Sequence, residues 1–308
     1  GDMTDMTPNN PPMFQFLTGI HEPSAIQQLP DGRFLVVEDE KQHPFSLFTL
    51  GPVGPIDVLP VEREADEALG KLDDLEGLTL DAAGNLYATT SHSRDGEGET
   101  KKSREKLVRL RIDGQRIVSA AVCRDLKAAL CADHAVLTQA AEVLDVKQDG
   151  GLNIEAIEIA PDSGQLLIGF RSPLQAGRAL IARLENPSDV FDNGAVPRIA
   201  ATLDTLDLGG HGIRGLAWLP SLGGYLLISG PVAREAAQFR LWFWRGSPNE
   251  PARVVSVEGL PGFEHAEGVS PALIDSQPRI LIVSDDGNRA AGRYARYLLL
   301  APPDLRIG

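Results

Sequence analysis

A strand pair recurs five times along this chain, and its clearest copy is Leu75-Glu76-Gly77-Leu78 followed by Leu86-Tyr87-Ala88-Thr89-Thr90-Ser91. In each copy a polar residue precedes a small residue and an apolar strand, and after a turn a second apolar strand ends in polar residues. The other four copies have their leading polar residue at Ser24, Glu155, Arg214 and Glu267. A strand-rich repeat of about 50 residues is typical of a propeller blade, so the sequence predicts an all-β, β-propeller fold.

Four strands can be laid out in each of the first four copies, with 197–203 as the outermost strand of the third. The last copy shows only three, at 266–270, 279–284 and 293–300. A propeller has to close its ring or leave a sheet edge open. The unused strand Met13-Phe14-Gln15-Phe16-Leu17 is therefore predicted to complete the last blade, which gives five four-stranded blades closed by the N-terminal strand.

The longest interval separates the second and third copies. Within it, residues 123–147 carry leucine and alanine at helical spacing, which predicts a helical insert. A sixth blade in this interval is the alternative, although no paired strands are visible there. Residues 1–12, rich in Asn, Pro and Thr, are predicted to be a disordered tail, and 13–308 a single propeller domain.

The charge limits the partners of the protein. The formal net charge is −14, whereas a nucleic-acid-binding protein needs a basic face. The sequence has no run of 18 apolar residues, so we expect no membrane span. We expect a monomer. The two cysteines do not show whether the protein works in an oxidising or a reducing compartment. A cytoplasmic and a periplasmic location in a bacterium are both consistent with the sequence.

Loop lengths predict which face carries a site. In the first four copies, the turn between the first and the second strand is tight (30–32, 81–84, 161–164, 221–224). We expect no room for a site among these turns. The loops at the other ends of the strands, such as 91–105, 171–178 and 285–293, are longer and charged. Because sites on rigid scaffolds lie on loops, the face with long loops is the predicted functional face. The three tryptophans fall in strand patterns and are expected in the core.

The five leading polar residues are predicted to line the mouth of the central channel. Glu76, Glu155 and Glu267 are candidate metal ligands there, because converging carboxylates hold hard cations such as Ca²⁺. The alternative is a repeat element that accepts backbone hydrogen bonds. Arg214 breaks the pattern, either as part of a ligand site or as an ion-pair partner of the neighbouring glutamates.

Arg171, Arg214 and Asp285 are the candidate ligand-binding residues. Arginine grips phosphate or carboxylate in a planar fork, and Arg171 directly ends an apolar strand. His92 is the candidate catalytic residue, since histidine serves as a general acid or base. The sequence contains no nucleophile elbow, Walker A loop, zinc spacing or dinucleotide fingerprint.

The stretches Leu152-Asn153-Ile154-Glu155-Ala156 and Ile168-Gly169-Phe170-Arg171-Ser172-Pro173 resemble a bacterial family, the domain of unknown function 3616. Asp74-Leu75-Glu76-Gly77 and Val283-Ser284-Asp285-Asp286-Gly287 resemble it as well, and the similarity covers about 20–300. The strand starts are also loosely similar to phytase-like esterase propellers. Ala156 and Arg214 depart from the glycine and glutamate of that pattern, which puts a shared metal site in doubt.

Two functions are consistent with these patterns. In the first, the channel mouth binds a small anionic ligand or substrate, and metal-assisted hydrolysis of a phosphoester or lactone could follow. In the second, the protein is a non-catalytic scaffold for a protein or glycan. Propellers host many unrelated functions, so whether the protein is an enzyme stays open. Convergent charged groups at the mouth would favour the first, and an exposed apolar patch the second.

Overall fold

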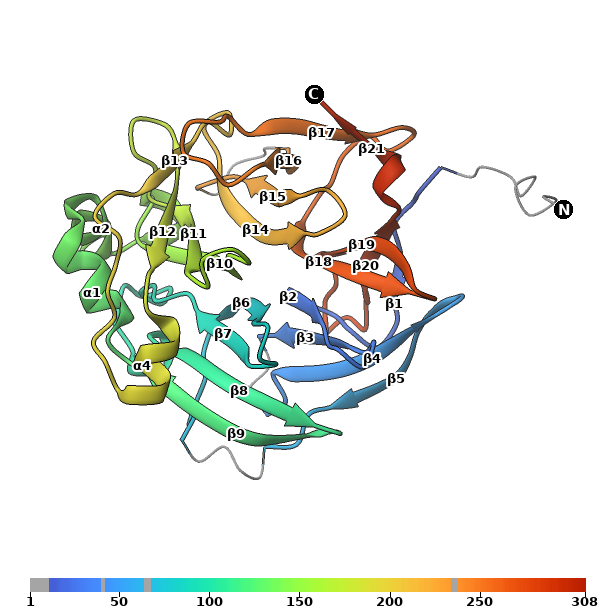
Figure 1. The fold of residues 1–308 in the computed structure, drawn as a ribbon, viewed down its shortest axis with the longest axis horizontal. Coiled ribbons are helices and arrows are strands. Elements are labelled where there is room, and N and C mark those ends of the chain that lie inside the picture. Colours follow the sequence, from blue (N-terminus) through green and yellow to red (C-terminus); the bar gives the residue numbers. More distant parts are fainter. Residues whose placement is uncertain (1–10, 40–41, 64–67, 234–237) are drawn as a thin grey trace, which may run out of the picture.

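Five antiparallel sheets stand around a central axis in the computed structural model, which describes residues 11–39, 42–63, 68–233 and 238–308. Figure 1 looks down this axis and shows the innermost strand of each sheet beside the centre. The innermost strands contact one another in the closed order β2–β6–β10–β14–β18 and back to β2. The predicted five-bladed propeller is confirmed.

The first two blades follow the chain in sequence order. Blade one consists of β2 (Pro23–Gln28), β3 (Phe34–Glu38), β4 (Phe45–Gly51) and β5 (Gly54–Pro60). Blade two consists of β6 (Leu75–Leu80), β7 (Leu86–Thr90), β8 (Leu107–Asp113) and β9 (Arg116–Cys123).

Blades three and four are built in the same way. Blade three consists of β10 (Asn153–Ile159), β11 (Leu166–Ser172), β12 (Ala179–Leu184) and β13 (Asp204–Leu206). Blade four consists of β14 (Gly212–Leu219), β15 (Gly224–Gly230), β16 (Arg240–Trp244) and β17 (Arg253–Val257), and β21 (Leu305–Ile307) pairs on its outer edge. The strand β21 had no counterpart in the sequence prediction.

The last blade closes the ring. It consists of β18 (Ala266–Ile274), β19 (Gln277–Ser284), β20 (Ala295–Leu300) and, from the start of the chain, β1 (Gln15–Leu17). Strand β1 runs antiparallel to β20, with Phe16 opposite Arg296. The predicted closure by the N-terminal strand is therefore confirmed. Most of the predicted tail, residues 1–10, lies outside the described residues.

The prediction of a strand at 197–203 was wrong. A helix, α4 (Pro187–Asn193), follows β12, with proline at its first turn and left-handed Gly194 at its end. The chain therefore returns to the sheet late, and the outer strand is the three-residue β13. Only Ile199 of the predicted segment makes a bridge, to Leu184.

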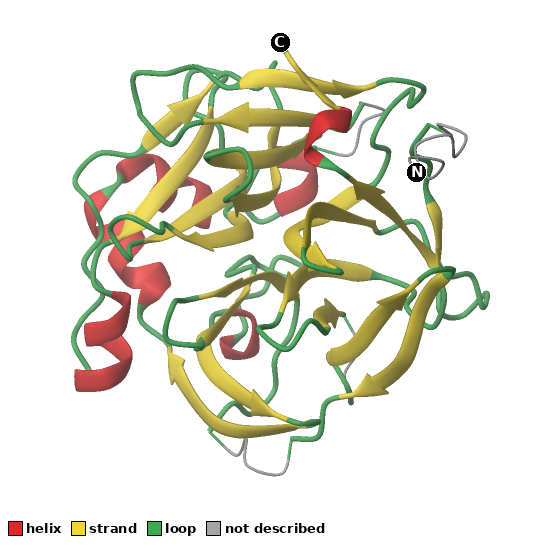
Figure 2. Cartoon of the chain, turned by 45° about the vertical axis from the view of Figure 1, so that its right-hand side comes forward, coloured by secondary structure: helices red, strands yellow, loops and turns green. Residues whose placement is uncertain are grey.

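The helical insert is present. It contains α1 (Leu126–Asp133), α2 (Ala135–Ala141) and α3 (Val146–Asp149). Helices α1 and α2 lie with α4 at one side of the ring (Figure 1), and Figure 2 shows most of the helical segments gathered at one side of the strands. Leu126, Leu130 and Leu137 are fully buried against blades two and three. Two 3₁₀ turns complete the helices, η2 (Lys102–Arg104) and η3 (Pro302–Asp304). Over the described residues, no helix is long and apolar enough to cross a membrane.

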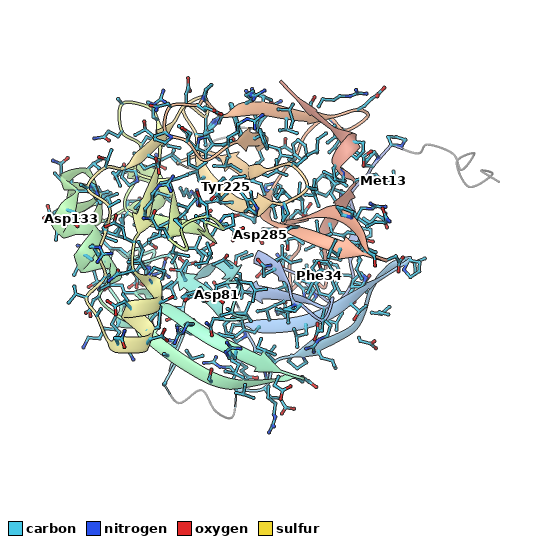
Figure 3. All side chains as sticks on the ribbon, viewed as in Figure 1. Met13, Phe34, Asp81, Asp133, Tyr225 and Asp285 are labelled. Carbon is cyan, nitrogen blue, oxygen red and sulfur yellow. The ribbon has the colours of Figure 1, made fainter. Side chains whose placement is uncertain are left out.

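The apolar core is divided into five clusters, one in each seam between neighbouring blades. Both faces of every sheet are therefore covered, and strands such as β7 and β11 are buried along their whole length. Figure 3 shows side chains filling the spaces between the sheets, with Asp285 near the centre and Asp133 at the periphery. This arrangement makes the central ring a rigid support for residues at the channel mouth.

Candidate ligand-binding cup at the channel mouth

Each innermost strand contains a β-bulge near its start, and the residue left without a partner is the leading polar residue of the repeat. In β6, Leu75 pairs with Thr90 and Gly77 with Thr89, which leaves Glu76 between them unpaired. The same shift occurs in the other four innermost strands, at Ser24, Glu155, Arg214 and Glu267. A bulge redirects the side chain of its extra residue, and here all five lie around the axis.

The small residues after these bulges let neighbouring strands approach closely. A Cβ on Gly77 would lie 3.0 Å from the backbone nitrogen of Ile157, and one on Gly215 would lie 2.9 Å from the carbonyl oxygen of Glu267. Beneath the bulges the channel narrows to a free volume of about 10 Å³, enough for about one water molecule. The five bulge residues therefore form a floor.

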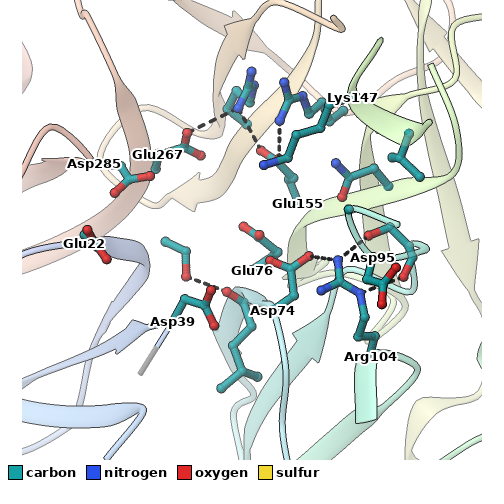
Figure 4. A pocket seen from close by; sticks show the side chains of 18 of the residues that line it. Glu22, Asp39, Asp74, Glu76, Asp95, Arg104, Lys147, Glu155, Glu267 and Asp285 are labelled. Carbon is teal, nitrogen blue, oxygen red and sulfur yellow. Dashed lines mark hydrogen bonds and ion pairs between the residues drawn. The ribbon is translucent and has the colours of Figure 1, made fainter. Parts of the chain in front are cut away.

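Above this floor lies a cavity of about 660 Å³, which we call the cup. Its walls come from the long loops, as the sequence predicted. Figure 4 shows charged side chains pointing into it from all around the ring. Nine lining residues carry a carboxyl group (Glu22, Asp39, Asp74, Glu76, Asp95, Asp145, Glu155, Glu267, Asp285) and five a positive charge (Arg94, Arg104, Lys147, Arg171, Arg214).

Two arginines and two glutamates form the buried part of the floor. Arg171 Nη1 lies 3.4 Å from Glu155 Oε1, and Arg214 Nη1 lies 3.5 Å from Glu155 Oε2 and 3.3 Å from Glu267 Oε1. All four residues are between 4% and 8% exposed. The group joins blades three, four and five and balances two negative charges with two positive ones.

These contacts leave much of the hydrogen-bonding capacity of Arg171 unused, whereas Arg214 Nη2 also donates a 2.8 Å hydrogen bond to the carbonyl oxygen of Pro231. Charge-assisted hydrogen bonds normally measure about 2.7–2.9 Å, so distances of 3.3–3.5 Å are long. A guanidinium has five N–H donors, yet the side chain of Arg171 makes one hydrogen bond among the described residues. The Nε atoms of Arg171 and Arg214 and the Oδ1 atom of Asn153 are buried without a partner there.

A second pair of carboxyl groups lies on blade two. Asp74 Oδ2 accepts a 2.8 Å hydrogen bond from Arg104 Nη2, and Asp74 also hydrogen-bonds with Glu76. Burial, together with the charges of Asp74 and Glu155, raises the pKa of Glu76 well above its usual value. The pKa of Asp74 is lowered, because its hydrogen bond with Glu76 and the charge of Arg104 outweigh its burial. Glu76 therefore binds a proton more readily than Asp74 does.

The pKa values of two more carboxyl groups of the cup are raised. Burial and the charge of Glu155 raise the pKa of Glu267 well above its usual value, although Arg214 opposes the shift. Loss of hydration and the charges of Glu22 and Glu155 raise the pKa of Asp285 to about 7. The cup is therefore less negative at neutral pH than the number of its carboxyl groups suggests.

The structure brings together most of the residues that the sequence singled out. Arg171, Arg214, Asp285 and the three glutamates all line the cup. His92 does not belong to the lining. It is 1% exposed, its Nδ1 lies 2.9 Å from the carbonyl oxygen of Thr90, and burial lowers its pKa to about 4.

The calcium site remains a prediction. Among the residues that the structure describes, no three histidine, cysteine, aspartate or glutamate side chains are grouped so that they could hold a metal ion. Arg214 forms ion pairs with both Glu155 and Glu267, and Arg171 forms one with Glu155.

Sequence reasoning did not assign a role to Asn153 or Lys147, which also line the cup. Asn153 lies two residues before Glu155 in the sequence, so it could have been found from the repeat. Lys147 reaches the cup from α3, and its position follows from the fold of the insert, which carries no repeat signal.

Comparison with known proteins places the chain in a family. A family model described as "Protein of unknown function (DUF3616)" matches residues 63–296. The comparison with curated proteins found no match.

Several solved structures are similar in outline. A PQQ-bound aldose sugar dehydrogenase from Streptomyces coelicolor is 15% identical with a TM-score of 0.47, over 94% of this chain and 99% of that one. A gluconolactonase from Xanthomonas campestris is 14% identical with a TM-score of 0.44, over 96% of each chain. The allergen Mala s 1 of Malassezia sympodialis is 10% identical with a TM-score of 0.41, over 85% of this chain and 74% of that one. These values are too low to transfer any of the three functions to the chain.

Proposed function

Because the chain belongs to the DUF3616 family, whose activity is not established, we propose a function from the cup itself: it binds a small anionic substrate and hydrolyses an ester bond in it. The observation that carries this proposal is the guanidinium of Arg171, buried at the floor with one long hydrogen bond. A buried group with unmet donors is costly, and a carboxylate or phosphate of the substrate would satisfy it.

The remaining charges of the cup suit such a ligand. Glu155 and Glu267 form ion pairs with Arg171 and Arg214, and the raised pKa of Glu76 favours the neutral form of that carboxyl group. A neutral carboxyl group can donate a hydrogen bond to a substrate oxygen. The floor therefore offers donors from the arginines and from Glu76 to one small polar molecule.

Asp74 and Glu76 supply the proton transfers for hydrolysis. Environments that push the pKa values of two carboxyl groups apart assign them as base and acid. Asp74, held ionised by Arg104, takes a proton from the water that attacks the ester or lactone carbonyl, or the phosphorus of a phosphoester. Glu76 gives its proton to the departing oxygen, and the proton on Asp74 then returns to Glu76 through their hydrogen bond.

The charged lining favours this function over a protein- or glycan-binding scaffold. Convergent carboxylates and arginines fill the face with the long loops. A docking face for a protein would be expected to present a contiguous apolar surface there.

Binding is tested by calorimetric titration with inorganic phosphate, gluconate and glucose 6-phosphate. We expect at least one of them to bind, and Arg171→Met to weaken it by about tenfold or more, since a charge-assisted hydrogen bond is lost. Arg171→Lys keeps the charge without the fork and should also bind more weakly. Arg178→Met is the matched control, because Arg178 lies outside the cup and donates to Thr205.

Catalysis is tested separately with gluconolactone and p-nitrophenyl phosphate. Glu76→Gln should abolish turnover and leave binding of the product within about threefold, because the amide still donates a hydrogen bond. Failure of all three anions to bind, or equal affinities of the Arg171→Met and Arg178→Met variants, would refute the binding site. Binding without turnover of either substrate would refute the hydrolase.

A further inference from the structure

The face with the tight turns is not closed, contrary to the sequence prediction. A cavity of about 430 Å³ opens there, which we call the far cavity. Each of the five innermost strands contributes to its lining, through Gln27, Leu80, Glu158 with Ile159, Trp218 and Pro271. The far cavity is thus the opposite mouth of the central channel, and the narrow segment of about 10 Å³ separates it from the cup.

The far cavity differs chemically from the cup. Most residues of its lining are apolar, among them Pro161, Pro187 and Pro220. Its volume is within the range of about 300–1,000 Å³ that is usual for small-molecule sites, which are mostly apolar with a few placed polar groups. The wall is preformed, because it is made of sheet ends and a helix start.

Trp218 gives this cavity an aromatic wall. The sequence placed Trp218 in the core with the other tryptophans, but it is only partly buried, whereas Trp242 and Trp244 are buried. Its ring packs edge-on against Tyr225, with centroids 5.0 Å apart. The edge-on contact holds the ring in place, and the part of Trp218 that stays exposed belongs to the lining of the cavity.

Glu158 provides the polar group. Its Oε1 accepts hydrogen bonds from the hydroxyl of Thr79 and from the backbone of Ile159, and its Oε2 accepts one at 2.6 Å from the backbone N–H of Trp218. A carboxylate oxygen can accept two hydrogen bonds, so Oε2 has one position left. The carboxyl group is thereby held between blades two, three and four at the wall of the cavity.

From this arrangement we propose that the far cavity is a second binding site, for a small neutral aromatic molecule that stacks on Trp218 and donates an N–H or O–H to Glu158. The proposal does not depend on the function of the cup. Anions suit the cup, where arginines meet them. Among the described residues, the lining of the far cavity holds no positive charge, and the carboxylate of Asp81 is already engaged by hydrogen bonds from Ala83 and Asn85 in its own turn. A neutral ligand therefore fits it better than an anion.

The test uses N-phenyl-1-naphthylamine, a neutral aromatic amine with one N–H whose fluorescence rises in apolar surroundings. We expect saturable binding at one site per chain. Ser188, exposed at the start of α4, lines the cavity, so Ser188→Trp should fill it. We expect this variant to bind at least about tenfold more weakly, the equivalent of about 1.4 kcal/mol, and Trp218→Ala to do so as well.

The matched control is Ser163→Trp, because Ser163 is an exposed serine in a turn of the same face but not part of the lining. It should bind the probe like the unchanged protein, and all variants should keep the same circular dichroism. Phosphate or gluconate in excess should not displace the probe. Non-saturable binding, or equal affinities for the Ser188→Trp and Ser163→Trp variants, would overturn the proposal. Displacement by gluconate would place the probe in the cup and overturn it too.

Discussion

Arg214 Nη1 lies 3.3 Å from Glu267 Oε1, so a guanidinium of blade four is paired with a carboxylate of blade five across the seam between them. The same nitrogen lies 3.5 Å from Glu155 of blade three. One cation thus connects three blades at the floor of the cup. Breaking a buried pair by removing one partner is costly, because a buried charge is left behind.

Arg214→Met should therefore lower the free energy of unfolding by about 3–5 kcal/mol at pH 8. Glu155 keeps Arg171, but Glu267 loses its ion pair. The loss should be smaller at pH 5, because the raised pKa of Glu267 lets it become neutral there. Urea unfolding at both pH values measures the difference.

Two variants check the cause. The Arg214→Met/Glu267→Gln double variant removes the carboxylate of Glu267 that is left unpaired in the single variant, so part of the free energy of unfolding should return. Arg198→Met breaks a pair of similar length, 3.2 Å to Glu185, that is exposed to solvent, and should cost less than about 1 kcal/mol. Equal losses for Arg214→Met and Arg198→Met would show that the floor is not held by this cation.

A second prediction concerns pH and Glu158. Burial raises the pKa of Glu158 to about 7 in spite of its hydrogen bonds to Thr79, Trp218 and Ile159. Between its usual pKa and about 7 the folded protein holds a proton that the unfolded chain has released. The free energy of unfolding should therefore fall as the pH rises through this window, and stay low above it.

In the Glu158→Gln variant the side chain cannot titrate, so the free energy of unfolding should fall less steeply as the pH rises. The slope should not vanish, because Glu76 and Glu267 also have raised pKa values. Denaturant unfolding from pH 5 to pH 8 gives the measurement, with Glu185→Gln, on the outer part of blade three, as the control. The explanation fails if both variants keep the slope of the unchanged protein.

A third prediction follows from the closure of the ring. Strand β1 covers the edge of β20, Leu17 is fully buried, and Tyr297 donates a 3.1 Å hydrogen bond to Gln15. Deleting residues 1–18 removes a buried leucine and opens a sheet edge, so Tm should fall by about 5–10 °C and aggregation should increase. Deleting 1–10 should change neither. If scanning calorimetry gives the same Tm for both truncations, β1 does not stabilise the ring.

The parts of the site that follow the repeat could be predicted from the sequence. Glu76, Glu155 and Glu267 occupy equivalent positions, and the small residue after each one reflects the close approach of neighbouring strands. Equivalent positions in a ring converge on its axis, so their convergence needed no coordinates. Arg214 stands where three other copies of the repeat have a glutamate. This change of charge at one equivalent position also indicated that the floor of the cup is a special region.

The parts that depend on non-repeating segments could not be predicted. Lys147 reaches the cup from α3, a four-residue helix of the insert, and the insert carries no repeat signal. His92 follows a strand in the repeat pattern, but its backbone is left-handed, with φ of 57°, and the ring turns into the protein. The sequence did not predict the far cavity. Turn residues indicate the backbone conformation of each loop, and they say nothing about the space between neighbouring loops.

The last prediction concerns the carboxyl groups that crowd the cup. Either protons neutralise them, as the raised pKa values of Glu76 and Asp285 indicate, or a cation does so by binding among them. The predicted Ca²⁺ would bind only the folded state and raise Tm by mass action. Because protons compete with it for the same oxygens, millimolar Ca²⁺ should raise Tm more at pH 8 than at pH 5.5. Glu76→Gln should reduce the rise, since it removes a predicted ligand. Identical melting with Ca²⁺ and with excess EDTA at pH 8, together with no metal by elemental analysis, would leave protons and the two buried arginines as the whole charge balance of the cup.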